Sequence, residues 1–323
     1  MEEMLNELLF LTKVFLNPLL FHNKVKIIAF LAIIFLFMPK SNIKKNLPNW
    51  YKIKHNFELL INKYKYLIRY EKNIEENSPI WMMWYQGIET APPIVLSCMQ
   101  SIIQNREKHP VIIISKYNLE KYIKLPSYIL DKLKKNVFSI THLSDIIRMA
   151  LLSKYGGYWI DSTYLVSTPF TKVNSSFFTL KLNYCWTNAL PFITCQWSGN
   201  FIASSKNSFI ATFGYNAFLY YWKKYNSLIY YFLIDYIIYT AYNTEKRFKK
   251  KIEVLPFTTC DIFSLKKSLN MTYNKTDFRC PFNKLSKNKK CNKTIGINDT
   301  NYGYIIKNYK FLFENENKTF FIK

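Results

Sequence analysis

Residues 144–163 read SDIIRMALLSKYGGYWIDST, and this stretch decides the fold. Its first part, Ser144 to Tyr155, has apolar residues at helical spacing, with Ser144 as the expected N-cap and Gly156 just past the end. Its second part, Tyr158 to Val166, is rich in aromatic and β-branched residues and predicts a buried strand. The stretch therefore predicts a helix that leads through a Gly-Gly turn directly into a sheet.

The residues before this stretch also alternate between strand and helix patterns. Ile80 to Trp84 and Val111 to Ile114 read as buried strands, and Pro92 to Asn105 between them reads as a helix that opens with prolines. Two short helices are expected next, at Leu119 to Tyr122 and at Ser127 to Lys135. Two strands joined by one helix suggest a βαβ unit, so we expect an α/β domain.

Beyond Phe170 the pattern is less regular. A long aromatic helical stretch is predicted from Phe209 to Tyr242, and a basic, Asn-rich tail follows from Lys266 to Lys293. We expect two parts of the chain. Residues 1–72 form a helical, basic and apolar segment, and residues 73–323 form the main domain.

The N-terminal segment contains an apolar run, Ile27 to Met38, with lysines on both sides. A bilayer core needs about 20 apolar residues in a helix, so this run of roughly 12 is short for a membrane span. Flanking lysines around Leu and Phe suit a helix that lies at an anionic headgroup layer. We expect peripheral membrane attachment, with a core helix of the domain and a signal anchor as open alternatives.

Composition excludes some classes of protein and favours one class of ligand. The chain has 323 residues, is 49% apolar and carries 45 Lys and Arg against 21 Asp and Glu, a net charge of +24. The apolar content supplies a core and excludes general disorder and collagen-like classes. The charge favours polyanions: nucleic acid, the phosphates of a nucleotide donor, or an anionic membrane. The runs KRFKKKI and KLSKNKK carry no nucleic-acid signature and read as solvated or membrane-facing surface.

The six cysteines include no C-x-x-C pair, which argues against a zinc site. In an oxidising compartment Cys185 could pair with Cys195, and Cys280 with Cys291. A domain of this size does not require disulfides, so we expect reduced thiols. The four histidines do not cluster, and H-E-x-x-H, nucleophile-elbow and P-loop patterns are absent from the sequence, which weakens hydrolase, protease and kinase interpretations.

Two of only seven aspartates, Asp145 and Asp161, lie within residues 144–163. Asp145 and Arg148 share one helix face, where they form a structural ion pair or jointly grip a polar ligand. Asp161 follows a buried strand, where a carboxylate either holds a divalent cation or is only a polar strand end. Asp235 lies in an aromatic, apolar helix, where it contacts a substrate or is a buried carboxylate satisfied by a tyrosine hydroxyl.

At these residues the chain resembles the capsular polysaccharide synthesis glycosyltransferases, relatives of the sugar-binding transferases that carry a D-x-D motif. The resemblance covers roughly Pro79 to Pro169 well, and it rests there on IWMMWYQG (Ile80 to Gly87), APP with a Cys-containing helix (Ala91 to Cys98), Leu125-Pro126 and SDIIRMALLSKYGGYWIDST. It continues more weakly through QWSGNFIAS (Gln196 to Ser204), YFLIDY (Tyr231 to Tyr236) and FNKLSK (Phe282 to Lys287).

The resemblance implies a Rossmann-like nucleotide-sugar-binding domain of the GT-A type, with the donor at the C-terminal edge of the sheet. It implies a hexosyltransferase-like enzyme that moves a sugar from a nucleotide-sugar, a UDP-sugar being favoured, to a glycan or lipid-linked glycan acceptor. Transfer with retention and a place in capsular or surface polysaccharide synthesis follow from the same resemblance, and no nucleic-acid partner is expected. The alternatives are a basic nucleic-acid-binding protein and a non-catalytic, membrane-associated scaffold of a polysaccharide assembly complex.

By position, the resemblance gives catalytic roles to Asp161, Asp145 and Arg148. Trp84 would stack near the donor base, Asp145 and Arg148 would hold ribose or sugar hydroxyls, and Asp161 would face the metal ion and the diphosphate. The wider donor-binding set comprises Trp84, Gly156, Gly157, Trp159, Asp145, Arg148 and Lys284.

This sequence departs from the D-x-D pattern, because Thr163 occupies the second acidic position and leaves a single carboxylate for an ion. The expected cofactor is Mn²⁺ or Mg²⁺, with Asp161, Asn283 and Thr163 as candidate ligands. A basic residue such as Lys284 could replace the missing metal charge, since both stabilise a departing diphosphate.

The expected location is the cytoplasmic face of a bacterial inner membrane, with the protein peripheral to it. The alternative is a Golgi-lumenal type II membrane protein. N-x-S/T triplets such as Asn270-Met271-Thr272 and Asn292-Lys293-Thr294 suit that alternative, although an Asn-rich sequence also produces them by chance.

Overall fold

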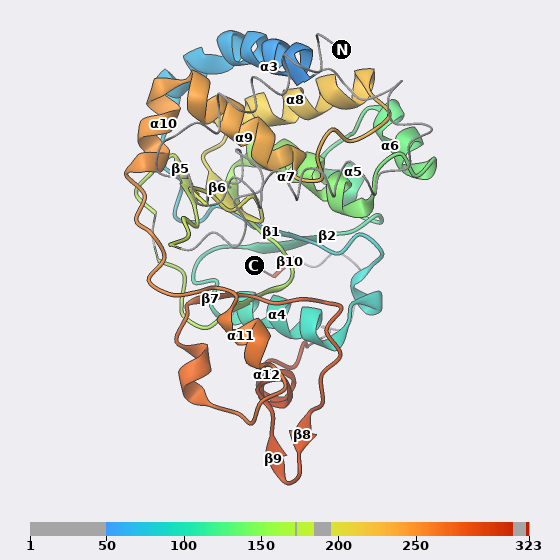
Figure 1. Ribbon diagram of the computed structural model, residues 1–323, viewed down its shortest axis with the longest axis vertical. Helices are drawn as coiled ribbons and strands as arrows, with labels where there is room; N and C mark the ends of the chain where they lie inside the picture. The colour runs from blue at the N-terminus through green and yellow to red at the C-terminus, as the bar shows by residue number, and fades with distance from the viewer. Residues whose placement is uncertain (1–49, 172, 184–194, 313–320, 323) are drawn as a thin grey trace, which may run out of the picture.

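The computed structural model describes residues 50–312 apart from 172 and 184–194, and also residues 321–322. These residues form a mixed α/β fold in three layers, with helices above and below a central sheet (Figure 1), so the predicted α/β class is confirmed. The described helices are α3 (Trp50–Tyr64), α4 (Pro93–Gln104), α5 (Leu119–Tyr122), α6 (Ser127–Lys134), α7 (Ile140–Tyr155), α8 (Phe209–Lys224), α9 (Leu233–Thr244), α10 (Lys246–Glu253), α11 (Ser264–Ser268) and α12 (Asn301–Asn308).

The middle layer is a six-stranded sheet in the order β10-β2-β1-β3-β6-β5. Its centre, β2-β1-β3, is parallel, and β10, β6 and β5 extend it by antiparallel pairing. Two small ladders, β4-β7 and β8-β9, lie outside it. The strands are β1 (Ile80–Met83), β2 (Val111–Ile114), β3 (Gly157–Ile160), β4 (Tyr164–Val166), β5 (Phe177–Thr179), β6 (Phe201–Ser204), β7 (Phe282–Lys284), β8 (Thr294–Ile295), β9 (Asn298–Asp299) and β10 (Phe321–Ile322).

The central strands are apolar on both faces because both faces are covered by helices. On β1, Trp81 and Met83 enter the core shared with α7, α8 and α9, whereas Ile80 and Met82 enter the core shared with α4 and α12. Strands of a parallel sheet buried in this way read as continuous apolar runs. The predicted strands at IWMM and VIII and the predicted helix between them are confirmed.

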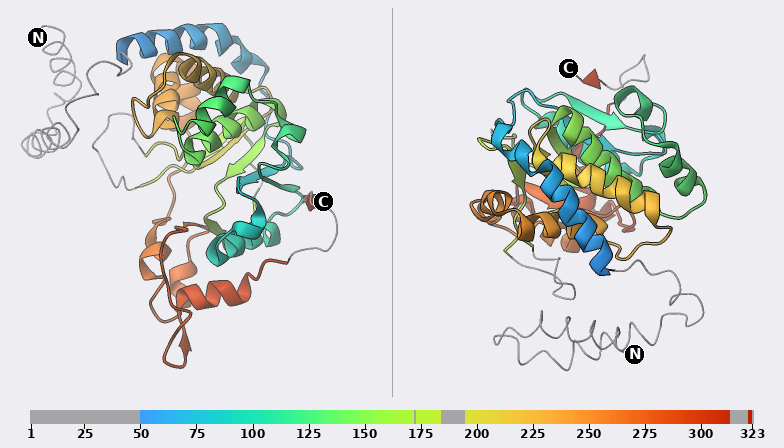
Figure 2. Two further views of the ribbon diagram at one scale, coloured as in Figure 1. Left: turned by 90° about the vertical axis from the view of Figure 1, so that its right-hand side faces the viewer. Right: turned by 90° about the horizontal axis from the view of Figure 1, so that it is seen from above.

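The helix α3 packs over α8 and α9 (Figure 2, right). Its Ile53, Phe57 and Ile61 are buried, and the Phe57 ring lies 5.9 Å from that of Tyr236 and 6.3 Å from that of Phe213. Residues 50–64 therefore contribute to the same core as the sheet. Within the described part of the chain, no helix has both the length and the apolar character that crossing a bilayer requires. The predicted interfacial helix at Ile27 to Met38 lies outside the described residues.

The helix before the Gly-Gly turn begins earlier than predicted. Ser139, not Ser144, is the N-cap of α7, and it forms a capping box with His142 at the third helical position. Ser144 lies inside the helix, where its hydroxyl donates to the Thr141 carbonyl. The predicted C-terminal boundary is confirmed, since Gly156 is the C-cap with φ of +71°.

Two predicted elements are each divided in the structure. The strand expected at Tyr158 to Val166 breaks into β3 and β4, because a turn closed by a hydrogen bond from the Tyr164 N–H to the Asp161 carbonyl redirects the chain. The helix expected from Phe209 to Tyr242 is two helices, α8 and α9, separated by residues 225–232. The expected basic tail at Lys266 to Lys293 contains β7 and short helical turns, so it is a folded part of the molecule.

The cysteines are not all reduced. Cys260 and Cys280 form a disulfide with Cα atoms 5.7 Å apart, and Cys291 is free, so the expectation of reduced thiols and the alternative Cys280–Cys291 pairing are both wrong. The chain between the paired cysteines folds back through α11, which no spacing rule predicts. Cys195 is disulfide-bonded, and Cys185 lies outside the described residues.

Gly157, the first residue of β3, lies close to the backbone of Pro79, the residue before β1, and this contact can be tested by mutation. Its φ is +96°, and an added Cβ would lie 2.1 Å from the Pro79 carbonyl oxygen. We expect Gly157→Ala to lower the free energy of unfolding by roughly 2–4 kcal/mol through strain and overlap. In urea denaturation the control Gly296→Ala, at φ of +58° with open space around it, should lose only about 1 kcal/mol. Equal losses in the two variants would contradict the close contact.

Candidate active site

The candidate site lies where the parallel strands β1 and β3 end. Asp161 is the first residue after β3, and the Ser162 hydroxyl donates to the Met83 carbonyl at the end of β1, 2.9 Å away. The neighbouring N–H of Asp161 donates to the Asn200 carbonyl at 3.1 Å. These bonds hold the Asp161 backbone at the carboxyl edge of the sheet, which is where open α/β sheets bind ligands.

The helix α7 brings Asp145 and Arg148 to this edge. Both residues are buried, and the Arg148 Nη1 lies 3.1 Å from the Asp145 Oδ1. The same Nη1 donates to the Gly199 carbonyl, and the guanidinium lies over the Trp159 ring at 5.0 Å. A buried guanidinium requires such partners, because unpaired charge in the interior is costly.

Asp161 accepts hydrogen bonds from three side chains. Its Oδ1 receives Arg148 Nη2 at 3.2 Å and the Trp159 indole N–H at 3.0 Å, and its Oδ2 receives Lys284 Nζ at 2.7 Å. About 28% of the Asp161 side chain remains exposed. The carboxylate is therefore held between two cations and still presents part of its surface to the cleft.

Lys284 reaches Asp161 from a distant part of the sequence. It lies on β7, which pairs with β4 in the register Tyr164 to Lys284, and its ammonium lies 5.0 Å above the Tyr164 ring. The ammonium also donates to the Thr163 hydroxyl at 2.8 Å. Lys284 thus occupies the space between the acid at position 161 and the hydroxyl at position 163.

The acids of this cluster titrate differently from free side chains. Burial raises the pKa of Asp145 to about 7, with Arg148 opposing the shift and Asp161 adding to it. Burial also raises the pKa of Asp235 to about 6, against the effect of its hydrogen bond from the Trp197 indole. Burial alone would raise the pKa of Asp161, but Lys284 and Arg148 outweigh it and hold that pKa below its ordinary value. Near pH 7, Asp161 is ionised, while Asp145 is close to half protonated.

A cleft of about 720 Å³ opens onto these residues. Asp145, Arg148, Asp161 and Asp235 line it from α7, the end of β3 and α9. On the side of the C-terminal segment (residues 254–312) its wall carries Lys266, Lys267 and Lys289 together with Asp261, which pairs with Lys267 at 2.9 Å, so the wall has a net positive charge. Its other lining includes Trp197, Gly199, Asn200, Tyr231 and Phe232. The cleft combines acids at its base, aromatic side chains and a cationic wall.

The residues around Asp161 do not fit a divalent cation as they are arranged. Both Asp161 oxygens accept hydrogen bonds from cationic groups, and the second acidic position of the motif is Thr163. Among the described residues, no group of three or more His, Cys, Asp or Glu side chains has the arrangement of a metal site. The metal assignment to Asp161, Thr163 and Asn283 stays a prediction, and no step below depends on an ion.

Asn283 lies on the opposite face of β7 from Lys284. Its side chain is fully buried, and its amide donates to the Cys280 carbonyl at 2.7 Å. Neighbouring residues of a strand point to opposite faces, so the register that aims Lys284 at Asp161 turns Asn283 away. The structure therefore does not bring Asn283 to the site as a ligand.

Several residues predicted to bind the donor do not line the cleft. Lys284 is one of them, and it reaches the site through its contact with Asp161. Trp84 follows β1, donates to the Thr90 hydroxyl at 3.0 Å and lies under the Lys287 ammonium. Trp159 is buried and acts through its hydrogen bond to Asp161. Gly156 and Gly157 lie at the opposite end of β3, where their positive φ and lack of a side chain permit the turn and the contact with Pro79.

Much of the cleft lining was not predicted from the sequence. Trp197, Gly199 and Asn200 belong to the QWSGN motif, which the resemblance included without giving these residues a role. Lys266, Lys267 and Lys289 fall in the segment predicted to be a basic, Asn-rich tail, and Lys289 also falls in a run interpreted as solvated or membrane-facing surface. The only available signal for these lysines was their density, and density does not distinguish a cleft wall from open surface.

Comparison with protein families matches residues 34–308 to the family described as capsular polysaccharide synthesis protein. Among solved structures, one titled PaToxG Glycosyltransferase is similar at 16% sequence identity, covering 62% of this chain and 83% of that chain with a TM-score of 0.35. A TM-score of that size does not establish a shared fold. No curated protein sequence matches the chain significantly.

The pKa of Asp145 predicts how stability depends on pH. The folded protein keeps the Asp145 proton up to about pH 7, whereas the unfolded chain releases it near the ordinary aspartate pKa of 3.8. Stability therefore falls as pH rises between these values, by about 2 kcal/mol from pH 5 to pH 7 for this group. We expect Asp145→Asn to flatten the pH profile of the free energy of unfolding, measured by urea denaturation. The raised pKa of Asp235 leaves a residual slope of the same sign. Parallel profiles for the wild-type protein and Asp145→Asn would contradict the assignment.

Proposed function

The chain belongs to the capsular polysaccharide synthesis protein family, and from this premise we propose that it is a glycosyltransferase that moves a sugar from a nucleotide-sugar donor to a glycan or lipid-linked glycan acceptor. The observation that carries the proposal is the Asp161 carboxylate, held between Arg148 and Lys284 at the carboxyl edge of the parallel strands and open to a cleft. We further propose a GT-A type of domain, hexosyl transfer and retention of configuration, which follow from the family resemblance. A place in capsular or surface polysaccharide synthesis fits the family.

The cationic wall supports binding of a diphosphate. Lys266, Lys267 and Lys289 face the cleft from the C-terminal segment, on a chain with a net charge of +24. A nucleotide-sugar carries its negative charge on the diphosphate, and more charge develops on the bridging oxygen as the sugar leaves. Positive groups fixed before the reaction stabilise that charge without reorganising. In this proposal the diphosphate lies along the lysine wall, with its sugar end toward Asp161.

Lys284 supplies the positive charge that a metal ion supplies in D-x-D enzymes. Its ammonium bridges Asp161 and Thr163, the two positions whose side chains would otherwise share an ion. Only about 15% of the Lys284 side chain is exposed, so water screens the charge weakly. We propose that this ammonium, together with Arg148, stabilises the departing diphosphate and makes a resident divalent cation unnecessary.

The two acids with raised pKa values suit recognition of sugar hydroxyls. Asp145 and Asp235 both line the cleft, from α7 and α9 respectively. Near neutral pH a partly protonated carboxyl both donates and accepts hydrogen bonds, which matches a hydroxyl that also does both. Because Asp145 is buried and Asp235 is partly buried, their hydrogen bonds to a sugar hydroxyl would be stronger than the same bonds at an exposed position. We assign these acids to the transferred sugar.

The aromatic side chains at the cleft offer a surface for the nucleoside. Tyr231 is 58% exposed, and its ring lies 5.0 Å from that of Phe232, which also lines the cleft. Aromatic faces stack on nucleobases without strong base preference. We propose Tyr231 as the platform for the base, in place of Trp84, with a UDP-sugar as the first donor to test. Attachment of the protein to an anionic membrane remains part of the proposal and rests on the basic sequence.

Asp161→Asn tests the proposed site without changing its shape. The amide cannot hold Lys284 and Arg148 by charge, so we expect kcat/KM for sugar transfer to fall about 100-fold or more. Labelled UDP-, GDP- and CDP-sugars are screened first, and transfer or donor hydrolysis is then measured for the variant. The control is Asp299→Asn, a partly exposed aspartate paired with Lys307 outside the cleft, which should keep full activity. Undiminished transfer by a folded Asp161→Asn protein would remove the proposed site.

Lys284→Met tests whether an ammonium replaces a metal ion. We expect wild-type transfer to persist in EDTA and Lys284→Met to lose about 100-fold or more, while Lys307→Met, at an exposed lysine paired with an aspartate, retains activity. Combining Lys284→Met with Thr163→Asp should restore transfer only when Mn²⁺ is added, because two carboxylates then face the vacated space. Loss of wild-type transfer in EDTA with recovery in Mn²⁺ would overturn the role of Lys284 and leave the glycosyltransferase proposal intact.

A further inference from the structure

The C-terminal segment contains a disulfide, which is typical of proteins that fold in an oxidising compartment. Cys260 and Cys280 are joined by a disulfide, and Cys195 is also disulfide-bonded. Disulfides persist in secreted and lumenal proteins and are rare in cytosol, where reducing systems keep thiols free. A lumenal location has a second consequence, because exposed N-x-T triplets are then substrates for attachment of glycans to asparagine.

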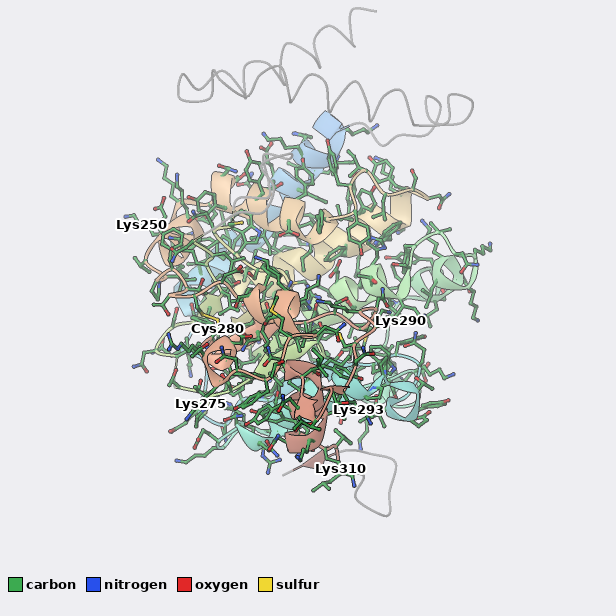
Figure 3. The ribbon with its side chains drawn as sticks, turned by 60° about the horizontal axis from the view of Figure 1, so that its bottom comes forward. Lys250, Lys275, Cys280, Lys290, Lys293 and Lys310 are labelled. Atoms are coloured by element: carbon green, nitrogen blue, oxygen red, sulfur yellow. A yellow bond between two sulfur atoms is a disulfide. The ribbon has the colours of Figure 1, made fainter. Side chains whose placement is uncertain are left out.

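Three such triplets lie at the surface of the segment that follows the cleft. They begin at Asn270, Asn274 and Asn292, and in each of them the asparagine and the threonine are both exposed. Figure 3 labels the middle residues of two triplets, Lys275 and Lys293, at the surface of this segment. The triplets belong to the part of the molecule around α11, α12 and the β8-β9 hairpin, at the far end from α3 (Figure 1).

The reactive atoms of these asparagines are accessible. The Asn270 Oδ1 accepts the Asn292 N–H at 2.8 Å, and the Asn274 Oδ1 accepts the Thr276 N–H and hydroxyl at 3.0 and 2.9 Å. In the described part of the chain, the side-chain amide nitrogens of these three asparagines donate no hydrogen bond. The three asparagines are exposed and their amide nitrogens have no partner among the described residues, so these nitrogens are available for attachment of a glycan.

Two other triplets within the described residues differ in the third residue. Thr300, in the triplet of Asn298, is fully buried, donates to the Asn292 carbonyl at 2.6 Å and caps α12. Ser176, in the triplet of Asn174, is buried and donates to Glu71 at 2.7 Å. The triplets are therefore of two kinds: in three of them the threonine is exposed, and in these two the hydroxyl is buried and hydrogen-bonded within the fold.

Exposed apolar side chains lie among the three triplets. Met271, the middle residue of the first triplet, is 62% exposed, and Ile297 at the tip of the β8-β9 hairpin is 99% exposed. Ile295, next to Thr294 of the third triplet, is 48% exposed. Apolar side chains gathered at a surface favour association unless something covers them. Bulky hydrophilic glycans on the neighbouring asparagines would cover this end of the molecule.

We propose that Asn270, Asn274 and Asn292 are N-glycosylation sites and that this domain folds in an oxidising, lumenal compartment. The co-substrate is a lipid-diphosphate-linked oligosaccharide of the host cell. The asparagine amide nitrogen forms a bond to C1 of the oligosaccharide, and the bond from C1 to the diphosphate oxygen breaks. The lipid diphosphate leaves with the electron pair, and the amide proton passes to the transferring enzyme. The modification is independent of the transferase activity proposed above.

The test uses the full chain with a tag after Lys323 and with no leader added, produced in cultured animal cells. The protein is denatured without reductant, alkylated, deglycosylated by peptide N-glycosidase in ¹⁸O water and digested with a protease. We expect ¹⁸O-labelled aspartate at positions 270, 274 and 292 and a cross-linked peptide that joins Cys260 to Cys280. Alkylation should mark the free cysteines, Cys98 and Cys291.

Matched variants separate attachment from changes in fold. Thr276→Ala should remove the label from Asn274, while Thr276→Ser should keep it, since serine retains the hydroxyl. Asn288→Gln changes an exposed asparagine of the same segment that starts no triplet, and it should leave all labels unchanged. Unlabelled asparagines at all three positions, or alkylated Cys260 and Cys280, would overturn the proposal while leaving the glycosyltransferase assay unaffected.

Discussion

The ion pair between Arg148 and Asp161 is the constraint on which the site depends. Arg148 is 3% exposed, so its charge requires partners, and it takes them from Asp145, Asp161 and the Gly199 carbonyl. These partners belong to α7, the end of β3 and the loop before β6, and one guanidinium therefore fixes the relative positions of three elements. Removing one member would leave a buried charge unpaired, which is more costly than losing a hydrogen bond alone.

The strands and helices that position the site were predicted well from local signals in the sequence. The apolar runs IWMM and VIII, the prolines that open α4 and the glycine after Tyr155 are read from a few neighbouring residues, and each is confirmed. Asp145, Arg148 and Asp161 were predicted together because they lie within one motif, and the structure places them in contact.

The features that were missed depend on distant contacts. The lysine wall becomes part of a cleft only when the C-terminal segment folds back. Lys284 was predicted at the site, but its hydrogen bond to Asp161, which spans 123 positions of sequence, was not. The break between α8 and α9 contains neither Pro nor Gly, so its largely apolar sequence, YNSLIYYF, reads as a continuous helix. Ser139 and Ser144 are equally good caps by residue type, and the choice falls to Ser139 because His142 completes a capping box.

The register in which β4 pairs with β7 determines which residue of β7 faces Asp161, and so determines the charge next to that carboxylate. Adjacent residues of β7 offer opposite chemistry, an ammonium at Lys284 and a neutral amide at Asn283, and the ladder lets only one of them face Asp161. A shift by one position would exchange the two. Inserting or deleting a single residue in the loop before β7 would thus take the ammonium away from Asp161 and leave an uncharged side chain in its place, with every side chain of the cleft still present in the chain.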